Sequence, residues 1–396
     1  MATDAGTGDV TDRFSLVAGG PFHRVLDRLG LIGADRLPTP RAAISLALLA
    51  WLPPALLAIA QSLADSHYSG WGFFTDWTVH ARYLVAIAVM VATDRYADGR
   101  LVTLARHFRD ARLLSDEGLS AFRAALAAAD RRSSSTLAEG LILAVALIWS
   151  SVTVPYAAAL AGSTWEGTVV AGVAQLSWAG ETARFVSNPL FLFLALRWFW
   201  WLVVWTALLY RISRLPLQLT PLHPDRAAGL GFLALFPGIF SGFAFALSCV
   251  IASSMVKDLA LEQHDPKIVW FAIAGWLGMN LVLFLGPLLV FIRPLYELRE
   301  RALLEYGRLA AQHHLAFHRK WVGEKRDGEE LMGSPDPSSA SDLNATVQAV
   351  QELHTFPVDR AAVMQLIIAA GIPMLAVVAT QIPLAELVQW IVGRIF

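Results

Sequence analysis

The chain has 396 residues, of which 56% are hydrophobic and only 16% are charged. Average soluble proteins are about 25% charged, so much of this protein's surface is expected to face lipid instead of water. The formal net charge of −1 does not favour a nucleic-acid partner. Cys249 is the only cysteine, which excludes disulfides within one subunit and multi-thiolate metal sites.

Seven apolar stretches predict an all-α membrane protein with about seven transmembrane helices. Most of them reach the roughly 20 residues that cross the hydrocarbon core of a bilayer. They comprise residues 42–60, 83–93, 141–160, 189–210, 230–255, 268–292 and 361–382. The second stretch is short, and it is expected to cross only if its helix begins near Trp77, with His80 and Arg82 reaching toward one interface.

Arginine and lysine residues alternate sharply between successive loops, and this alternation predicts the orientation. Basic residues are enriched in the cytoplasmic loops of membrane proteins. They are dense in residues 1–41, 94–136 and 293–360, whereas the connection between the first two apolar stretches holds only Arg82. The amino terminus is therefore expected in the cytoplasm.

The same pattern divides the chain into six regions. They are a cytoplasmic amino-terminal segment (residues 1–40), a first transmembrane hairpin (41–93), cytoplasmic amphipathic helices (94–136), a four-helix transmembrane core (137–292), a cytoplasmic stalk and loop (293–360) and a carboxy-terminal broken membrane helix (361–396). In the third region, Leu101, Leu104 and Phe108 recur at helical spacing. Lysines are rare among the 31 basic residues, a bias typical of bacteria with GC-rich genomes, which favours a bacterial inner membrane.

Arg197 lies near the middle of the fourth apolar stretch. A charged Arg at the centre of a membrane helix costs roughly 2.5–3.5 kcal/mol on insertion scales. One interpretation is an ion pair with Glu139 or Glu181, because charges within membranes usually pair. The other is a cation that lines an aqueous path and favours anions. The sequence leaves both open.

The loop between the fourth and fifth stretches has a distinctive sequence. Residues 219–233 are Leu-Thr-Pro-Leu-His-Pro-Asp-Arg-Ala-Ala-Gly-Leu-Gly-Phe-Leu. Asp225 is well placed to cap the next helix, which is the usual role of Asp before a helix. Alternatively, His223, Asp225 and Arg226 form a cytoplasmic mouth, where His titrates near neutral pH and Arg attracts anions.

This loop resembles the motif Thr-Pro-x-His-Pro-Asp followed by Gly-Leu-Gly-Phe-Leu in a group of uncharacterised bacterial multi-pass integral membrane proteins. The resemblance extends to Val-His-Ala-Arg at residues 79–82, to Arg197 and Trp198, and to Leu-Met-Gly-Ser-Pro-Asp at residues 331–336. It implies a class of membrane protein and no particular activity. Ala228 stands where a second glycine is expected at the start of the next helix.

Small and polar residues mark the fifth and sixth stretches. Gly238 and Gly242 form a small-xxx-small pair, which is typical of helices that pack closely. Ser241 and Ser248 lie one heptad apart, and they can alternatively line an aqueous path. Asn280 can line the same path or hydrogen-bond to a neighbouring helix.

Beyond the sixth stretch, residues 297–321 predict a helical stalk with paired charges such as Glu297 and Arg301 at i,i+4. His314 and His318 share one helical face, but neither a cysteine nor a protease-type glutamate accompanies them, so we expect no metal site. Pro373 is expected to break the last membrane helix.

These features favour a channel or transporter for small ions or solutes, with Arg197, Asn280, Ser241 and Ser248 along its path. The alternative is a non-transporting scaffold or sensor that acts through its cytoplasmic helices. We do not expect an enzyme, because no acid and base can be paired on a common cleft, and we expect no cofactor. The expected partners are membrane lipids, a small ion or solute, and further copies of the chain, without nucleic acid.

Overall fold

The computed structural model describes residues 14–65, 70–161, 164–170, 173–261, 266–323 and 334–381. Over these residues the fold is almost entirely helical, as predicted. The helices are α2 (Gly20–Arg28), α3 (Pro40–Ala64), α4 (Trp71–Thr75), α5 (Trp77–Val79), η1 (His80–Ala86), α6 (Ile87–Asp110), α7 (Asp116–Ser133), α8 (Thr136–Ala161), α9 (Trp178–Thr182), η2 (Ala183–Ser187), α10 (Asn188–Ile212), η3 (Gly231–Leu235), α11 (Phe236–Ile239), α12 (Ser241–Leu261), α13 (Pro266–Leu285), η4 (Gly286–Phe291), α14 (Ile292–Trp321), α15 (Asp336–Gln351), α16 (Arg360–Gly371) and α17 (Met374–Gln381). Strands β1 (Gly167–Val170) and β2 (Val173–Leu176) form an antiparallel pair.

Five helical segments of the described chain are long and apolar enough to cross a membrane. They are Pro40–Ala64, Asp116–Ala159, Trp178–Ile212, Gly231–Leu259 and Lys267–Trp321. Helices α16 and α17 meet the same criterion only as a pair bent by 49°, and counting them as one span gives six. This bend lies at the predicted break near Pro373. The chain is therefore a multi-pass membrane protein by the length and composition of its helices.

The second apolar stretch is not among these five segments, and its crossing stays a prediction. The predicted start of its helix at Trp77 is confirmed, because α5, η1 and α6 follow one another without a break from there to Asp110. A π-helical turn forms the middle part. The sequence placed a boundary at Asp94, but α6 continues through it with Leu101, Leu104 and Phe108 buried.

Helix α3 has an exposed face and a buried face that suit a helix in a lipid bilayer. Its exposed face carries Leu48, Leu52 and Leu56 at i,i+4 spacing, whereas alanines such as Ala43 and Ala47 lie buried. Large apolar side chains on an outer face are stable in hydrocarbon, and small residues on the inner face let neighbouring helices approach. The helix begins at Pro40, which needs no backbone N–H in the first turn.

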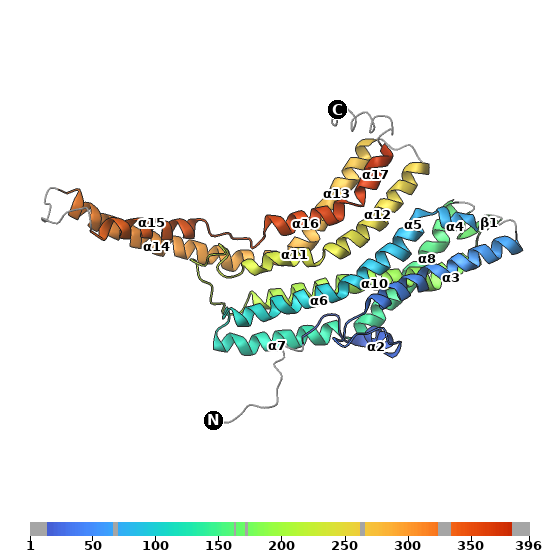
Figure 1. Cartoon of the computed structure of the whole chain (residues 1–396), viewed down its shortest axis with the longest axis horizontal. Coiled ribbons are helices and arrows are strands. Elements are labelled where there is room, and N and C mark those ends of the chain that lie inside the picture. The colour runs from blue at the N-terminus through green and yellow to red at the C-terminus, as the bar shows by residue number, and fades with distance from the viewer. Residues whose placement is uncertain are drawn as a thin grey trace, which may run out of the picture.

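Figure 1 shows an elongated molecule. Helices α14 and α15 lie side by side and extend beyond one end, which we call the stalk end. Helix α4 and strands β1 and β2 lie at the opposite end, which we call the β1–β2 end. Between these ends α3 packs against α6, and α10 packs against α7 and α8. Helix α12 joins this group to α16 and α17.

The fifth apolar stretch is not the single helix that the sequence predicts. It begins as the 3₁₀ turn η3 and the short helix α11, and a residue outside both, Phe240, separates α11 from α12. Phe240 is buried, and its ring lies 5.7 Å from that of Trp198 and 5.4 Å from that of Phe284. The bend therefore turns a large aromatic side chain into the contact between α10, α12 and α13.

Candidate functional site

A pocket at the β1–β2 end gathers charged side chains between three of the candidate membrane segments. It encloses about 250 Å³, and we call it the Arg82 pocket. Helix α8 contributes Thr153, α10 contributes Asn188, and α12 contributes Val250. Arg82 enters from η1, and Glu166 enters from the turn that precedes β1. The pocket thus joins elements that are far apart in the sequence.

Arg82 is held in the wall of this pocket. Its Nη1 donates a hydrogen bond to Asn188 Oδ1 at 3.1 Å, and the Tyr83 hydroxyl donates to the same oxygen at 2.9 Å. The guanidinium carbon lies 5.9 Å from the centre of the Phe191 ring. Arg82 therefore lies between helices at the β1–β2 end, and its predicted reach toward an interface stays a prediction.

His80 is likewise held within the protein. Trp51 Nε1 donates to His80 Nδ1 at 3.0 Å, and His80 Nε2 lies 2.9 Å from the carbonyl oxygen of Phe74. These two partners fit a neutral imidazole whose proton is on Nε2. The ring therefore links α3 to the start of η1, and the predicted position of His80 near an interface stays a prediction.

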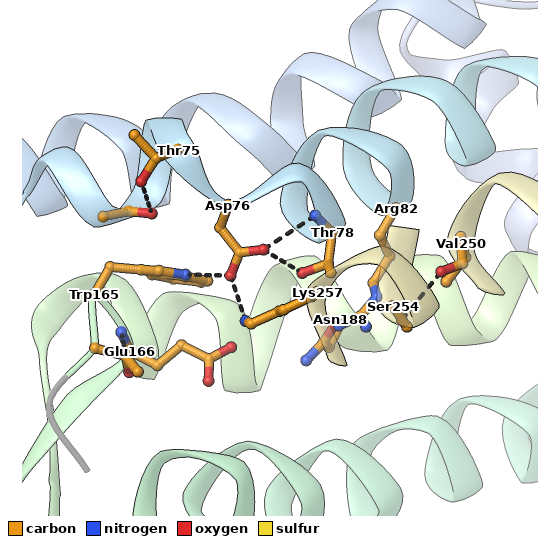
Figure 2. Close-up of polar contacts among 12 residues, drawn as sticks. Thr75, Asp76, Thr78, Arg82, Trp165, Glu166, Asn188, Val250, Ser254 and Lys257 are labelled. Carbon is orange, nitrogen blue, oxygen red and sulfur yellow. Dashed lines mark hydrogen bonds and ion pairs between the residues drawn. The ribbon is translucent and has the colours of Figure 1, made fainter. Parts of the chain in front are cut away.

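An ion pair borders the pocket (Figure 2). Lys257 Nζ lies 2.8 Å from Asp76 Oδ2, and Trp165 Nε1 donates to the same oxygen at 3.2 Å. The Thr78 backbone N–H and hydroxyl donate to Asp76 Oδ1 at 3.0 and 2.6 Å. Burial raises the pKa of Asp76, but hydrogen bonds from Lys257, Thr78 and Trp165 outweigh burial and hold that pKa below its usual value. Asp76 is thus committed to the charged form.

Glu166 is the contrasting carboxyl group. Figure 2 shows its side chain extending toward Lys257 and Asn188 without a drawn contact. Within the part of the chain that the structure describes, no hydrogen bond satisfies its carboxylate. Burial raises the pKa of Glu166, and the nearby charges of Lys257 and Arg82 offset this only in part. Glu166 therefore holds its proton to a higher pH than a carboxyl group in water.

The four charged groups can change their net charge with pH. Arg82 and Lys257 supply two positive charges, and Asp76 supplies one negative charge. The cluster therefore carries +1 when Glu166 is protonated and 0 when Glu166 is ionised. A pocket with this arrangement can attract a small anionic or zwitterionic solute in the first state and release it in the second.

Arg197 lies elsewhere, in an ion pair with Glu139. Its Nε lies 3.4 Å from Glu139 Oε1, and the two side chains are only 3% and 4% exposed. Its Nη2 donates to the carbonyl oxygen of Val17 at 3.1 Å. The predicted partner Glu139 is confirmed, whereas Glu181 lies 3.8 Å from Arg184 instead. That Arg197 lines a solute path stays a prediction.

The segment before α2 and the first turn of α2 cover this ion pair. The Phe22 backbone N–H donates to Glu139 Oε2 at 2.8 Å. The Leu16 N–H and the Ser15 hydroxyl both donate to Asp98 Oδ1 at 2.8 Å. The amino-terminal segment therefore seals one side of the helices that carry Arg197 and Glu139.

The other predicted path residues each have a protein partner. Trp276 Nε1 donates to the Ser248 hydroxyl at 2.8 Å, and Asn280 Nδ2 donates to the Trp276 carbonyl oxygen at 2.8 Å. Asn280 thus bonds within its own helix and not to a neighbour. Gln365 Nε2 donates to the Ser241 hydroxyl at 3.3 Å. None of these three residues, nor Arg197, lines the Arg82 pocket.

Asp225 caps the first residue of η3 from within the preceding loop, as the sequence favours, although the N-cap position itself is Leu230. Its Oδ1 accepts from the N–H groups of Ala227 at 2.9 Å and Gly229 at 3.1 Å, and its Oδ2 accepts from Gly231 at 2.7 Å. His223 Nδ1 lies 2.8 Å from Asp225 Oδ1. Ala228 has a φ of 58°, the left-handed conformation that favours glycine, which agrees with the glycine expected there.

Metal binding has no support among the residues that the structure describes, where no group of three or more His, Cys, Asp or Glu side chains could hold an ion. His314 instead lies 2.9 Å from Asn344 Oδ1 and so joins α14 to α15.

Asp76, Glu166 and Lys257 were not among the site residues predicted from the sequence. Asp76 and Lys257 are 181 residues apart, so no local pattern connects them. The only available signal was their position, since each charge borders an apolar stretch where a buried partner is needed.

Comparison of the chain with protein-family models, with curated proteins and with solved structures found no match. The function is therefore inferred from the geometry of the Arg82 pocket and its surroundings.

Proposed function

We propose that this protein transports small ions or solutes across a membrane, and that the Arg82 pocket is the site where the solute binds. The observation that carries this proposal is a pocket between three candidate membrane segments that holds both an arginine and a carboxyl group without a hydrogen-bond partner among the described residues. Ionisable groups that face a cavity between membrane helices usually mark the pathways of substrates, ions or protons.

A route from the pocket toward the stalk end follows α12. The pocket reaches Val250, and Ser248 and Ser241 precede it on the same helix, with Trp276 linking Ser248 to Asn280. In this proposal the hydrogen bonds of the two serines open during transport, and Arg197 favours anions at the opposite side of the helix group. His223, Asp225 and Arg226 border the exit at the stalk end.

The proposed setting is a bacterial inner membrane, with seven spans and with the amino terminus and the stalk in the cytoplasm. The alternation of basic loops supports this orientation, and the resemblance carried by residues 219–233 supports membership of that bacterial group. The proposed path is completed by association of several copies. The small-residue pair Gly238 and Gly242 does not support this association, because both glycines pack against Gln365 and Thr93 of the same chain.

Transport can be tested with the purified protein in proteoliposomes on a solid-supported membrane. We expect a transient current on addition of at least one of four probes, namely chloride, acetate, glycine and sodium, measured from pH 5.5 to 8. Arg82→Gln is expected to reduce the current about tenfold or more, since one charged hydrogen bond to the solute contributes about 1.5–3 kcal/mol. Glu166→Gln is expected to retain a current that no longer depends on pH.

The matched control is Glu181→Gln, which neutralises an acid at the same end of the molecule that lies against Arg184 and does not line the pocket. Its current is expected to equal that of the wild type. Folded wild-type protein that gives no current with any of the four probes, or an Arg82→Gln current equal to that of the wild type, would contradict the proposal.

A second candidate function is a scaffold or sensor that acts through the stalk. Helices α14 and α15 extend beyond the rest of the molecule, and α14 exposes Leu304 and Leu315 to 76% and 57%. Exposed apolar side chains on a projecting helix favour a protein partner. Photo-crosslinkers placed at these two positions in cells would capture that partner, whereas a stalk that crosslinks only to lipid or to nothing argues for transport alone.

A further inference from the structure

A second pocket lies at the stalk end, where three parts of the chain meet. It has a volume of about 870 Å³ and lies between residues 219–233, which we call the Asp225 loop, helix α14, and the connection from α15 to α16. Pockets for small ligands commonly enclose about 300–1,000 Å³. Its basic side chains are Arg226, Arg299 and Arg360, with His354 beside them, so we call it the arginine pocket.

Each part of the wall is fixed by backbone contacts. The His354 N–H donates to the Arg226 carbonyl oxygen at 2.7 Å, which ties the connection to the Asp225 loop. Arg299 Nη2 donates to the Gln351 carbonyl oxygen at 2.9 Å, which ties α14 to the end of α15. Arg226 has a φ of 54°, an uncommon conformation for a residue with a side chain. The three arginines are therefore brought together by the fold, not by chance exposure.

The charges of the pocket do not cancel. Arg226 Nη2 lies 3.3 Å from Glu352 Oε2, and the second acid in the wall is Asp359. Three arginines and two carboxylates leave a surplus of one positive charge before His354 is counted. Arg299 Nε is buried and, among the described residues, has no hydrogen-bond partner. The surplus positive charge of the wall therefore favours a negatively charged acceptor from outside the chain.

The chemistry of the wall indicates what this acceptor is. The planar guanidinium group of arginine matches phosphate oxygens with two parallel hydrogen bonds. Helix α16 begins at Arg360, and its N-cap residue Asp359 makes no capping hydrogen bond with its side chain. The free N–H groups of a helix start add favourable interactions with phosphate. Leu353 and Phe356 give the pocket an apolar side that accepts a nonpolar group attached to the phosphate.

We propose that the arginine pocket binds a phosphate-bearing ligand, either a soluble phosphorylated metabolite or the headgroup of an anionic phospholipid. The ligand holds the stalk against the Asp225 loop, because its phosphate contacts arginines from both. This site is separate from the Arg82 pocket and does not depend on the transport proposal.

Two titrations on the full-length protein in a neutral detergent distinguish the sources. Isothermal titration calorimetry with pyrophosphate and with ADP tests a soluble ligand. Native mass spectrometry with added dioleoylphosphatidylglycerol, against dioleoylphosphatidylcholine, tests a lipid headgroup. Binding in either arm that weakens as salt rises supports the site, and the arm in which it occurs identifies the source.

Variants assign the binding to the pocket. Arg299→Gln and Arg360→Gln are each expected to weaken binding about tenfold to a hundredfold, which corresponds to the loss of one charge-assisted hydrogen-bond pair. Arg308→Gln removes an exposed arginine of the same helix outside the pocket and is expected to change nothing. Glu352→Gln frees Arg226 and lowers the local negative charge, so it is expected to tighten binding severalfold.

The gain expected from Glu352→Gln keeps the test decisive even if an arginine variant does not fold, since a misfolded protein does not bind more tightly. The proposal is overturned if the folded wild type binds neither pyrophosphate, ADP nor phosphatidylglycerol, or if Arg308→Gln weakens binding as much as the two pocket variants do.

Discussion

Arg197 and Glu139 form an ion pair in which both side chains are almost fully buried. Removal of one partner leaves the other charge uncompensated, which typically costs about 3–5 kcal/mol. We expect Arg197→Leu to lower the midpoint of thermal unfolding strongly, measured by tryptophan fluorescence in detergent. Arg197→Leu combined with Glu139→Gln is expected to recover part of the loss, because Glu139 no longer carries an unpaired charge, whereas the buried carboxyl group of Asp94 still loses its interaction with Arg197.

Arg211→Gln serves as the control, because Arg211 is exposed at the end of the same helix. If the double variant is as unstable as the sum of its two single variants, the ion pair is not the reason for the instability. If Arg197→Leu unfolds like the wild type, the pair contributes nothing to folding.

Asp225 gives a prediction that differs from the one the sequence alone supports. A cap can usually be served by Asn, but here both carboxylate oxygens accept backbone hydrogen bonds, so Asn would lose one acceptor. We expect Asp225→Asn to cost about 1 kcal/mol, the typical value of one such hydrogen bond. His223→Gln is expected to cost less, and circular dichroism during heating at pH 7 measures both.

The pH dependence of the Asp225 variant checks the same contacts. Burial raises the pKa of Asp225. The hydrogen bonds from the N–H groups of Ala227, Gly231 and Gly229 lower this pKa by more than burial raises it, so that it lies below the usual value. A lowered pKa in the folded state gives stability that is complete above the unfolded value of about 3.9 and is lost as pH falls through the folded value. Below about pH 4 the wild type should therefore lose stability faster than Asp225→Asn. Parallel curves would show that the carboxylate is not held by these N–H groups.

At the residue scale, the sequence predicts what depends on neighbours along the chain. The Asp225 cap follows from Asp before a helix, and the partner of Arg197 follows from the few acids near apolar stretches. The contacts of Arg82 do not follow, because Asn188 is 106 residues away. The two acids Asp76 and Glu166 acquire opposite pKa directions only from their tertiary surroundings.

Close packing between elements can be tested at Gly242, where α12 meets α6. A Cβ atom added at Gly242 would overlap Thr93 Cγ2. Overpacking of this kind costs about 1–3 kcal/mol, so Gly242→Ala is expected to lower the unfolding midpoint. Thr93→Ser removes that methyl group and keeps the hydroxyl, which donates to the Val89 carbonyl oxygen at 2.7 Å. The combination with Gly242→Ala is expected to restore stability.

Gly278→Ala is the control, since a Cβ atom there meets nothing within 4 Å. Equal losses in Gly242→Ala and Gly278→Ala would show that the effect does not come from contact with Thr93.

At the element scale, apolar length predicts the helices that cross lipid but not where helices end or bend. Residues 83–93 look too short because polar Asp94 and Asp98 follow them, yet both are buried in α6 and the helix runs on. The break at Phe240 did have a local signal, because Pro237 and Gly238 precede it and Ser241 and Gly242 follow it, but the small-xxx-small spacing of the glycines predicts only close packing. Pro373 gave a similar signal, since proline cannot continue the backbone hydrogen bonds.

The orientation of the whole molecule rests on the count of basic residues. Reporter fusions that end at Ser134 and Ser213 are expected to give a cytoplasmic signal, and one that ends at Gly167 a periplasmic signal, with alkaline phosphatase and green fluorescent protein as paired reporters. A control fusion at Ser62, beyond most of α3, should be periplasmic. A periplasmic signal at Ser134 would mean that the helix from Trp77 to Asp110 does not cross.

The amino-terminal segment that covers Arg197 and Asp98 forms its contacts with these residues at different times during synthesis. Val17 binds Arg197, which the ribosome adds 180 residues later, a delay of about 10–35 s at typical rates of translation. The segment that emerges first can bind Asp98 and Glu139 once α6 and α8 are in place, but its contact with Arg197, and so its complete docking, forms only after α10 is in place. A protease that recognises loose amino-terminal segments would thus distinguish chains whose insertion stopped early from those in which it was completed.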